Sequence, residues 1–388
     1  MIRIDINKLL FTIGYVVILI KIFIDSSTIQ AIPFFELIKN NYTAPATIIL
    51  IILSLFKINY IRNISLKNLI GLILVFSSLL LSIYFSQSSS LRYLMFLIFL
   101  AFNIELRYIV KTFLIIKLPI VVLLISLSLS GVIENFEFID KNRGARYAFG
   151  AIYATDFAAS IFYLQMAYYY LRKNINILEV LVSSVITYLV YIYTGARVSV
   201  ILMTLAITIF YLAGTRFSWI VKSIFKNKIM SFIFVIGFAI STILSYTYSY
   251  TDKTMVLLDE FLSGRLRLGN LAFNNYDIKL FGQKIILQGN GWTQHEWDSS
   301  IGYNFIDASY LQWLFIYGIA VTVILLVLLV LVYKKGVEVN NLPLIMILSL
   351  IAISGVIDHH LLNLGMNPFI FALAVIIFNR DKVDKLWA

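Results

Sequence analysis

The sequence has no cysteine and few charged residues, and each absence excludes a class of protein. Without cysteine, the chain cannot be a small scaffold held together by disulfide bonds. Asp, Glu, Lys and Arg make up only 13% of the 388 residues, whereas soluble globular domains contain about 25%. Hydrophobic residues reach 61%, which excludes a water-soluble enzyme of this size and also a disordered chain. The composition therefore indicates a polytopic membrane protein.

Several common catalytic patterns are also missing from the sequence. It contains no glycine-rich loop of the nucleotide-binding type and no Ser-His-Asp signature. His295, Glu296 and the triplet Asp358-His359-His360 do not have the spacing of a zinc site, and adjacent residues point apart on a regular element. We therefore expect neither a metal nor a cofactor.

Long apolar runs make up most of the sequence. A membrane-spanning helix needs about 20 mainly apolar residues. About twelve such segments occur, which predicts an all-α polytopic protein with a single integral-membrane domain over residues 1–388. The predicted spans are 9–24, 43–61, 68–86, 91–104, 108–131, 148–171, 177–194, 197–213, 229–248, 307–333, 342–357 and 364–379.

The basic residues indicate which way the chain crosses the membrane. The net charge is +11, and most Lys and Arg residues fall in the loops on the N-terminal side of the membrane. Because cytoplasmic loops of membrane proteins are rich in Lys and Arg, we predict that both termini are cytoplasmic. The chain is then a multi-pass protein of the cytoplasmic membrane, and its positive charge requires no nucleic-acid partner.

Two predicted outer loops are long enough to contribute to a site. One covers residues 132–147, and the other covers residues 249–306 between the ninth and tenth spans. A loop as long as 249–306 is usually functional or disordered, and its aromatic content argues against disorder. We expect it to form part of an active-site cover. Within it, the amphipathic run 255–272 predicts a helix that lies either on the membrane surface or on top of the bundle.

Charged and imidazole side chains gather near the predicted outer ends of the spans. Arginine binds phosphate through a planar pair of donors and stays charged, so several arginines at one membrane face suit a phosphorylated lipid head group. The residues in this set are Arg146, Asp156, Arg197, Arg265, Arg267, Asp307, His359 and His360.

Most of these residues also have a simpler structural interpretation. Arg197 lies between two spans, where it either contacts substrate or reaches the interface as a snorkelling side chain. Arg265 and Arg267 are two residues apart and do not point the same way on a helix, so we expect Arg265 to face the site unless it is a solvated loop charge. Asp156 is either a base or a partner of an arginine. Asp307 is either a base or a helix cap.

The stretch Gly289-Asn290-Gly291-Trp292 predicts a turn that exposes an aromatic ring. An exposed Trp fits against the face of a sugar, although a Trp at the membrane interface is the simpler interpretation. Both interpretations place Trp292 on the outer side of the membrane.

Four stretches together resemble the Wzy-type polymerases of O-antigen and capsular polysaccharide, which are relatives of the O-antigen ligases. The similarity covers roughly residues 146–320. The stretches are Arg146-Tyr-Ala-Phe-Gly150 with Ala154-Thr-Asp156-Phe, Thr194-Gly-Ala-Arg197, Leu262-Ser-Gly-Arg265-Leu with Leu280-Phe-Gly-Gln283 and Gly289-Asn-Gly-Trp292, and Asp307-Ala-Ser-Tyr310-Leu with Tyr317-Gly318. Asp307 stands where the ligases carry His, which favours a polymerase. Ala154-Thr155-Asp156 replaces the His-Pro-Asn that is often found after the Phe-Gly element.

The resemblance implies a glycosyltransferase that joins undecaprenyl-diphosphate-linked oligosaccharide repeat units on the outer face of the membrane. Arg197 and Arg265 would stabilise the diphosphate leaving group, and Asp307 would be the base, in a metal-independent displacement with inversion. The residues that would bind diphosphate or sugar are Arg146, Asp156, Arg267, Trp292, Tyr310, His359 and His360. A chain-length regulator and a flippase of the same pathway are implied as partners.

Other functions fit parts of the same pattern. A lipid-linked oligosaccharide flippase would have a similar number of spans, but it should carry charges along a central path, whereas the few intramembrane charges here lie towards the outer side. A ligase that passes a finished glycan to a different acceptor is distinguished mainly by Asp307. A structural membrane protein would make the arginine cluster coincidental. We therefore expect a polymerase.

Overall fold

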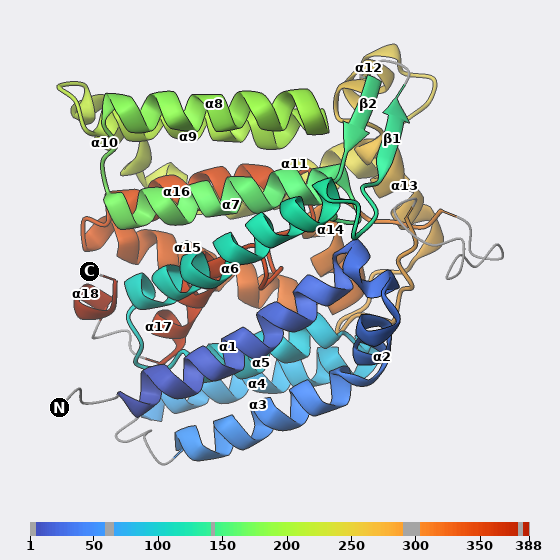
Figure 1. Ribbon diagram of the computed structural model, residues 1–388. Coiled ribbons are helices and arrows are strands. Elements are labelled where there is room, and N and C mark those ends of the chain that lie inside the picture. The colour runs from blue at the N-terminus through green and yellow to red at the C-terminus, as the bar shows by residue number, and fades with distance from the viewer. Residues whose placement is uncertain (1–4, 59–65, 141–143, 290–302, 379–382, 388) are drawn as a thin grey trace.

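The computed structural model describes residues 5–58, 66–140, 144–289, 303–378 and 383–387, and it is a bundle of helices that run side by side (Figure 1). Both termini lie at one end, which we name the terminal end. The opposite end, named the loop end, carries short helices and a hairpin. These elements are α2 (Pro33–Asn41), α12 (Lys253–Phe261), α13 (Arg265–Asn275), and the strands β1 (Glu137–Asp140) and β2 (Gly144–Tyr147).

The helices are arranged in three groups across the bundle (Figure 1). The first group is α1 (Ile6–Asp25), α3 (Thr43–Ile58), α4 (Leu66–Ser86) and α5 (Ser89–Leu100). The middle group is α6 (Leu106–Leu129), α7 (Ala154–Arg172), α11 (Ile233–Tyr246), α15 (Gly318–Glu338), α16 (Leu342–Ser354) and α17 (Ala372–Phe378). The last group is α8 (Ile177–Thr194) and α9 (Arg197–Ala213), with the short α10 (Ser218–Phe225) after them. Small elements complete the chain: η1 (Thr28–Ala31), η2 (Lys228–Phe232), α14 (Ser309–Gln312), η3 (Trp313–Tyr317), η4 (Pro368–Phe371) and α18 (Val383–Leu386).

Each predicted apolar segment contains one of these helices. Among the described residues, six helices are long and apolar enough to cross a membrane, or up to eight if each bent pair, α2 with α3 and α9 with α10, is one span. Others, such as α5 and α16, are apolar but shorter. The chain is thus mostly helical, with the apolar helices of a helical membrane protein.

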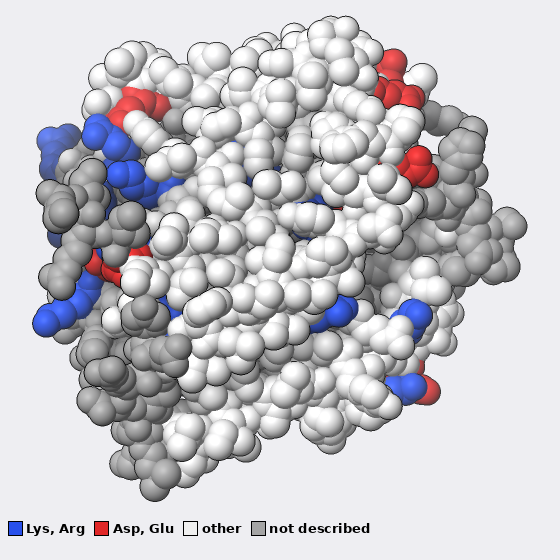
Figure 2. All heavy atoms as spheres, turned by 60° about the horizontal axis from the view of Figure 1, so that its bottom comes forward, with Lys and Arg blue, Asp and Glu red and all other residues white. Residues whose placement is uncertain are grey.

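The side surface of the bundle is apolar. Leu55 on α3, Leu74 on α4 and Leu178 on α8 are each 60% exposed or more. Figure 2 shows a broad belt of uncharged side chains between the two ends. Exposed apolar area of this extent is unfavourable in water and favourable in hydrocarbon, so this surface supports the membrane assignment.

Basic side chains gather at the terminal end, on the left of Figure 2. Lys8 at the start of α1 pairs with Glu105, with 3.4 Å between Nζ and Oε1. Arg107 at the start of α6 donates to the Leu171 carbonyl at the end of α7. On the face shown in Figure 2, basic side chains are therefore more frequent at the terminal end than at the loop end.

The sixth predicted span begins later than expected. The antiparallel hairpin β1–β2 lies within the predicted outer loop 132–147, and the chain then turns at Phe149 and Gly150, whose φ angles are 49° and 82°. Helix α7 begins only at Ala154, so Asp156 lies in its first turn and not nine residues into a span. A carboxylate at this position is favoured by the helix dipole.

The amphipathic run 255–272 is not one helix. Ser263 and Gly264 have φ angles of 59° and 84°, and they break the run into α12 and α13. Helix α13 packs on α11, where the Asn270 amide donates to the Ser245 carbonyl at 3.0 Å. Helix α13 therefore lies on top of the bundle, which is one of the two predicted positions.

Candidate active site

Two neighbouring cavities open at the loop end. We name the first, of about 290 Å³, the cationic cavity. The second, of about 680 Å³, is named the serine cavity after the residues of the α4–α5 turn. The cationic cavity contains five of the predicted site residues, and its lining is Phe138, Arg146, Tyr153, Thr155, Asp156, Ser263, Arg265, Leu268, Tyr303, Phe305, Asp307 and His359.

Arg265 is held firmly at the start of α13. Its Nε donates to the Ile357 carbonyl at 2.9 Å, and its Nη1 donates to the Leu262 carbonyl at 3.2 Å. Its Nη2 pairs with Asp358 Oδ1 at 3.3 Å, and both side chains are largely buried. Because a guanidinium carries more N–H donors than these contacts use, Arg265 still has donors for an anion in the cavity.

Arg146 approaches the same cavity from β2. Its Nε donates to the Thr194 carbonyl at 2.7 Å, directly before Gly195 at the end of α8. A Cβ at Gly195 would lie only 3.2 Å from that Nε, so glycine makes room for the arginine. Two of the stretches that resemble the polymerases therefore meet at this point.

Arg197 is the first residue of α9 and is half-buried. Its side chain forms no ion pair or hydrogen bond within the described part of the chain, and it is not among the residues that line the cationic cavity. It follows Thr194 closely and so lies near Arg146. The arginine that shares the cavity with Arg265 is Arg146, and a role for Arg197 stays a prediction.

Asp307 is not a helix cap. The N-cap of α14 is Ala308, with no side-chain capping bond, so the cap interpretation is wrong. Across the described ranges, the Asp307 carboxylate has no hydrogen bond or ion pair. Burial raises the pKa of Asp307, and the charge of Arg265 opposes that shift while Asp358 adds to it. Among the described residues, this side chain therefore has no partner, and it lines a cavity together with a fixed arginine.

The turn that carries Asp358 is tied to the chain just after Asp307. Ser309 Oγ donates to the Asp358 carbonyl at 2.6 Å, and the Ser309 N–H donates to the Gly355 carbonyl at 3.1 Å. The Leu361 N–H in turn donates to Ser309 Oγ. One buried serine thus holds the turn next to Asp307, and the sequence pattern contained no signal for this connection.

Asp156 contacts His360 rather than an arginine. Its Oδ1 lies 3.5 Å from His360 Nε2, and ligand atoms of Asp156, His359 and His360 lie within 4.8 Å of one another. Burial lowers the pKa of His360 to about 3 and that of His359 well below its usual value, so both imidazoles are neutral at pH 7. Among the described residues, these three side chains could hold a metal ion. His295 and Glu296 lie outside the described residues.

Three predicted binding residues lie elsewhere. Arg267 is exposed, and its backbone N–H donates to Asp259 Oδ1, as expected for a residue two positions from Arg265 on a helix. Tyr310 is fully buried, donates to the Ala352 carbonyl at 2.9 Å and lines neither cavity. Its side chain is part of the helical core. Trp292 lies outside the described residues.

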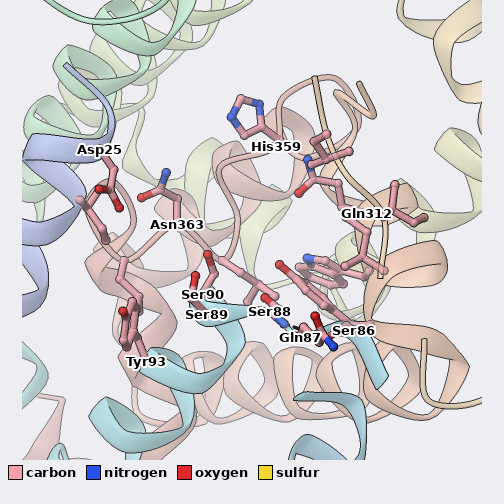
Figure 3. Close-up of a pocket in the computed structure, with 18 of the residues that line it drawn as sticks. Asp25, Ser86, Gln87, Ser88, Ser89, Ser90, Tyr93, Gln312, His359 and Asn363 are labelled. Atoms are coloured by element: carbon pink, nitrogen blue, oxygen red, sulfur yellow. Dashed lines mark hydrogen bonds between the residues drawn. The ribbon is translucent and has the colours of Figure 1, made fainter. Parts of the chain in front are cut away.

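The serine cavity is a feature that the sequence did not predict. It adjoins the cationic cavity, because Phe305 and His359 line both of them. The signal in the sequence was the polar run 86–90 between two apolar segments, which is where α4 ends and α5 begins. Figure 3 shows side chains from α1, from this turn and from the segment 359–363 around one hollow.

Two other resembling stretches also meet at the loop end. The Gln283 N–H donates to the Ile316 carbonyl at 3.1 Å, and the Ala320 N–H donates to the Leu280 carbonyl at 3.0 Å. A Cβ at Gly282 would lie 2.0 Å from the Ile316 carbonyl oxygen, so only glycine fits. The stretch 280–283 therefore packs against the backbone at Tyr317-Gly318 and holds it in place.

Comparison with protein-family models, with curated proteins and with solved structures gave no match. The function must therefore be argued from the residues of the two cavities.

Proposed function

We propose that the protein is a polysaccharide polymerase that joins undecaprenyl-diphosphate-linked oligosaccharide repeat units by glycosyl transfer. The observation that carries this proposal is the content of the cationic cavity. Arg146 and Arg265 share it with Asp307, a carboxylate that has no hydrogen bond or ion pair within the described part of the chain. Two fixed cations and one available base are the groups that transfer from a lipid diphosphate requires.

The chemistry follows from these groups. A hydroxyl oxygen of the acceptor attacks the anomeric carbon of the donor sugar, and its proton passes to Asp307. The bond between the anomeric carbon and the diphosphate oxygen breaks, and the diphosphate leaves with the electron pair. Arg265 and Arg146 stabilise the charge that develops on the phosphate oxygens. A single displacement of this kind inverts the anomeric configuration, and the donor is already activated, so no nucleotide is needed.

The charge distribution supports an outward-facing site. With the basic terminal end in the cytoplasm, both cavities lie on the extracytoplasmic side of the cytoplasmic membrane. In this proposal the short apolar helices also cross the membrane, which gives about twelve spans, and the segment 249–306 covers the site.

The Asp156–His360 contact and the neighbouring His359 have a positioning role in this proposal. Neutral imidazoles accept or donate hydrogen bonds to sugar hydroxyls, and the reaction proceeds without a metal. Chelation by EDTA should therefore leave the activity unchanged. Loss of activity in EDTA that Zn²⁺ or Mn²⁺ restores would assign a metal to Asp156, His359 and His360 and contradict this part of the proposal.

The test uses purified protein and a defined undecaprenyl-diphosphate repeat unit in detergent without nucleotide. We expect a ladder of repeat-unit multiples on a gel. Arg265→Ala should lower the rate about 100-fold, and Asp307→Asn about 1000-fold, because they remove leaving-group stabilisation and the base. Lys253→Ala, an exposed charge at the start of α12, is the matched control and should keep the wild-type rate.

Three results would overturn the proposal. A ladder of normal length from both Arg265→Ala and Asp307→Asn would remove the cationic cavity from the chemistry. Absence of a ladder with a competent substrate, together with movement of the lipid between liposome leaflets, would indicate a flippase. Transfer to a different acceptor only, without a ladder, would indicate a ligase.

A further inference from the structure

The serine cavity, at about 680 Å³, is larger than the cationic cavity beside it. Its walls come from parts of the chain that are far apart in sequence: the end of α1, the α4–α5 turn, the segment around α14 and the segment 359–364 (Figure 3). A volume of this order accommodates a ligand of several rings.

The lining mixes polar and apolar side chains and is almost uncharged. Hydroxyl and amide groups come from the run Ser86-Gln87-Ser88-Ser89-Ser90 and from Gln312 and Asn363. Of the described residues that line the cavity, only Asp25 and Lys284 carry a charge at neutral pH, and Asp25 already pairs with Lys21 one turn earlier in α1. Such a lining does not match a phosphate, which would need fixed cations.

Several polar groups in the wall are available to a ligand. Asp25 Oδ1 has no hydrogen-bond partner among the described residues. Asn363 accepts the Gly365 N–H through Oδ1, which leaves its amide N–H groups to donate. The side chains of Ser89 and Ser90 are not hydrogen-bonded within the described part of the chain. Acceptors and donors mixed in this way match the hydroxyls of a sugar.

Aromatic rings form the other part of the wall. Tyr93, Trp313 and Tyr317 line the cavity with Phe305. The C–H faces of a sugar pack on aromatic rings, so hydroxyl-rich and aromatic walls together are suited to a glycan.

The cavity is preformed by contacts behind its wall. Ser82 Oγ donates to the Tyr317 carbonyl at 2.9 Å, and Ser86 Oγ donates to the Ser82 carbonyl at 2.6 Å. The Gln312 amide donates to the Ile306 carbonyl at 2.7 Å. These bonds fix α4 and the turn after it against η3, so the wall keeps its shape without a ligand.

The position of the serine cavity beside the cationic cavity indicates its role. Phe305 and His359 line both cavities, with their ring centroids 5.2 Å apart in an edge-to-face arrangement. These two rings separate the serine cavity from the cavity that holds Asp307. A glycan in the serine cavity therefore ends at the boundary with the cavity that Asp307 lines.

We infer that the serine cavity binds the terminal sugars of the acceptor glycan and directs one hydroxyl past Phe305 and His359 towards Asp307. This inference rests on the proposed polymerase function. In the transfer step, that hydroxyl oxygen bonds to the anomeric carbon of the donor and its proton goes to Asp307. The bond to the donor diphosphate breaks, and the lipid diphosphate leaves with the electron pair.

The test distinguishes an effect on acceptor binding from an effect on donor binding. Initial rates are measured with a lipid-linked donor and a lipid-free repeat-unit oligosaccharide as acceptor, each varied in turn. Ser89→Trp fills the cavity and should raise the acceptor KM at least tenfold, while the donor KM changes less than twofold. Tyr84→Trp, 75% exposed on α4 and outside the cavity lining, is the matched control and should change neither KM.

A binding measurement tests the inference independently of catalytic turnover. Saturation-transfer NMR with the lipid-free oligosaccharide should give a signal with wild type and with Asp307→Asn, which still binds acceptor but lacks the base. The signal should be lost with Ser89→Trp, whose melting temperature should match that of Ser89→Ala.

Three results would overturn the inference. They are a raised donor KM with an unchanged acceptor KM, no change in either KM for Ser89→Trp, and an oligosaccharide signal that Ser89→Trp retains. Failure of the proposed function looks different, because wild type would then join no repeat units to the oligosaccharide acceptor.

Discussion

At the scale of single residues, the surroundings of Asp307 explain why it suits the role of a base. Its carboxylate faces a cavity instead of capping α14, and the nearby Asp358 carboxylate is engaged by Arg265. Burial and the charge of Asp358 raise the pKa of Asp307, while Arg265 lowers it. A carboxyl group with a raised pKa takes up a proton more readily than an ordinary aspartate, which suits a general base.

The pH dependence of kcat/KM should reflect these opposing effects on the pKa of Asp307. Activity requires ionised Asp307, so it should fall as the pH drops through a pKa that lies above the ordinary value of 3.8. Asp358→Asn removes a negative charge that raises this pKa, and it also leaves Arg265 less neutralised. Both effects lower the pKa of Asp307, so the acid limb of kcat/KM should move to lower pH. An unchanged limb, or one that moves to higher pH, would mean that another group is the base.

The sequence predicted part of the site at this scale. Arg146, Asp156, Arg265, Asp307 and His359 do come together in one cavity. The partners of these residues could not be predicted, because they depend on contacts between elements that are far apart in the chain. Examples are the pair of Arg265 with Asp358 and the contact of Asp156 with His360. Spacing alone also could not show that Tyr310 points into the core.

At the scale of elements, the junction between the segment 280–283 and the start of α15 supports both cavities. Gly282 and Gly318 have φ angles of 79° and 87°, and their backbones pack directly on each other. The carbonyl of Tyr317 also accepts the bond from Ser82, which links this junction to α4. The junction therefore positions the wall of the serine cavity.

Gly282→Ala should destabilise the protein. The new Cβ would lie 2.0 Å from the Ile316 carbonyl oxygen, and alanine is strained at a φ of 79°. Strain at one such residue costs about 2 kcal/mol, and the clash adds to it. We expect a lower melting temperature in detergent and a weaker ladder. Gly71→Ala in α4, with nothing within 4 Å of the added Cβ, is the control and should melt like wild type. Equal melting of the two variants would contradict this role of the junction.

The sequence predicted long apolar helices better than the connections between them. The bounds of α8 and α9 agree with the predicted 177–194 and 197–213, because apolar residues fill each segment and Gly195 separates them. The hairpin β1–β2 and the break between α12 and α13 were not predicted. Backbone conformations such as the positive φ of Ser263 depend on local packing and leave little trace in residue patterns.

At the scale of the whole molecule, the main cluster of basic side chains and the two candidate cavities lie at opposite ends. Basic side chains mark the terminal end (Figure 2), and residues of the loop end line the cationic and serine cavities. A basic cytoplasmic end fixes the orientation in the membrane, so the cavities face outwards in the proposed topology.

Cysteine labelling tests this orientation directly. The natural chain has no cysteine, so each single-cysteine variant carries one reactive group. Lys253→Cys at the loop end should react with a membrane-impermeant maleimide in intact cells. Arg216→Cys, an exposed position between α9 and α10, should react only after the membrane is permeabilised. The reverse pattern would place the cavities in the cytoplasm and contradict the proposed topology.

The central claim is that the protein transfers a glycosyl group from a lipid diphosphate to a second repeat unit. The most direct measurement counts undecaprenyl diphosphate released and glycosidic bonds formed by the purified protein, without nucleotide and in EDTA. The account predicts one lipid diphosphate released for each bond formed, with both lost in Arg265→Ala. Lipid that crosses a bilayer without diphosphate release or bond formation would contradict the account.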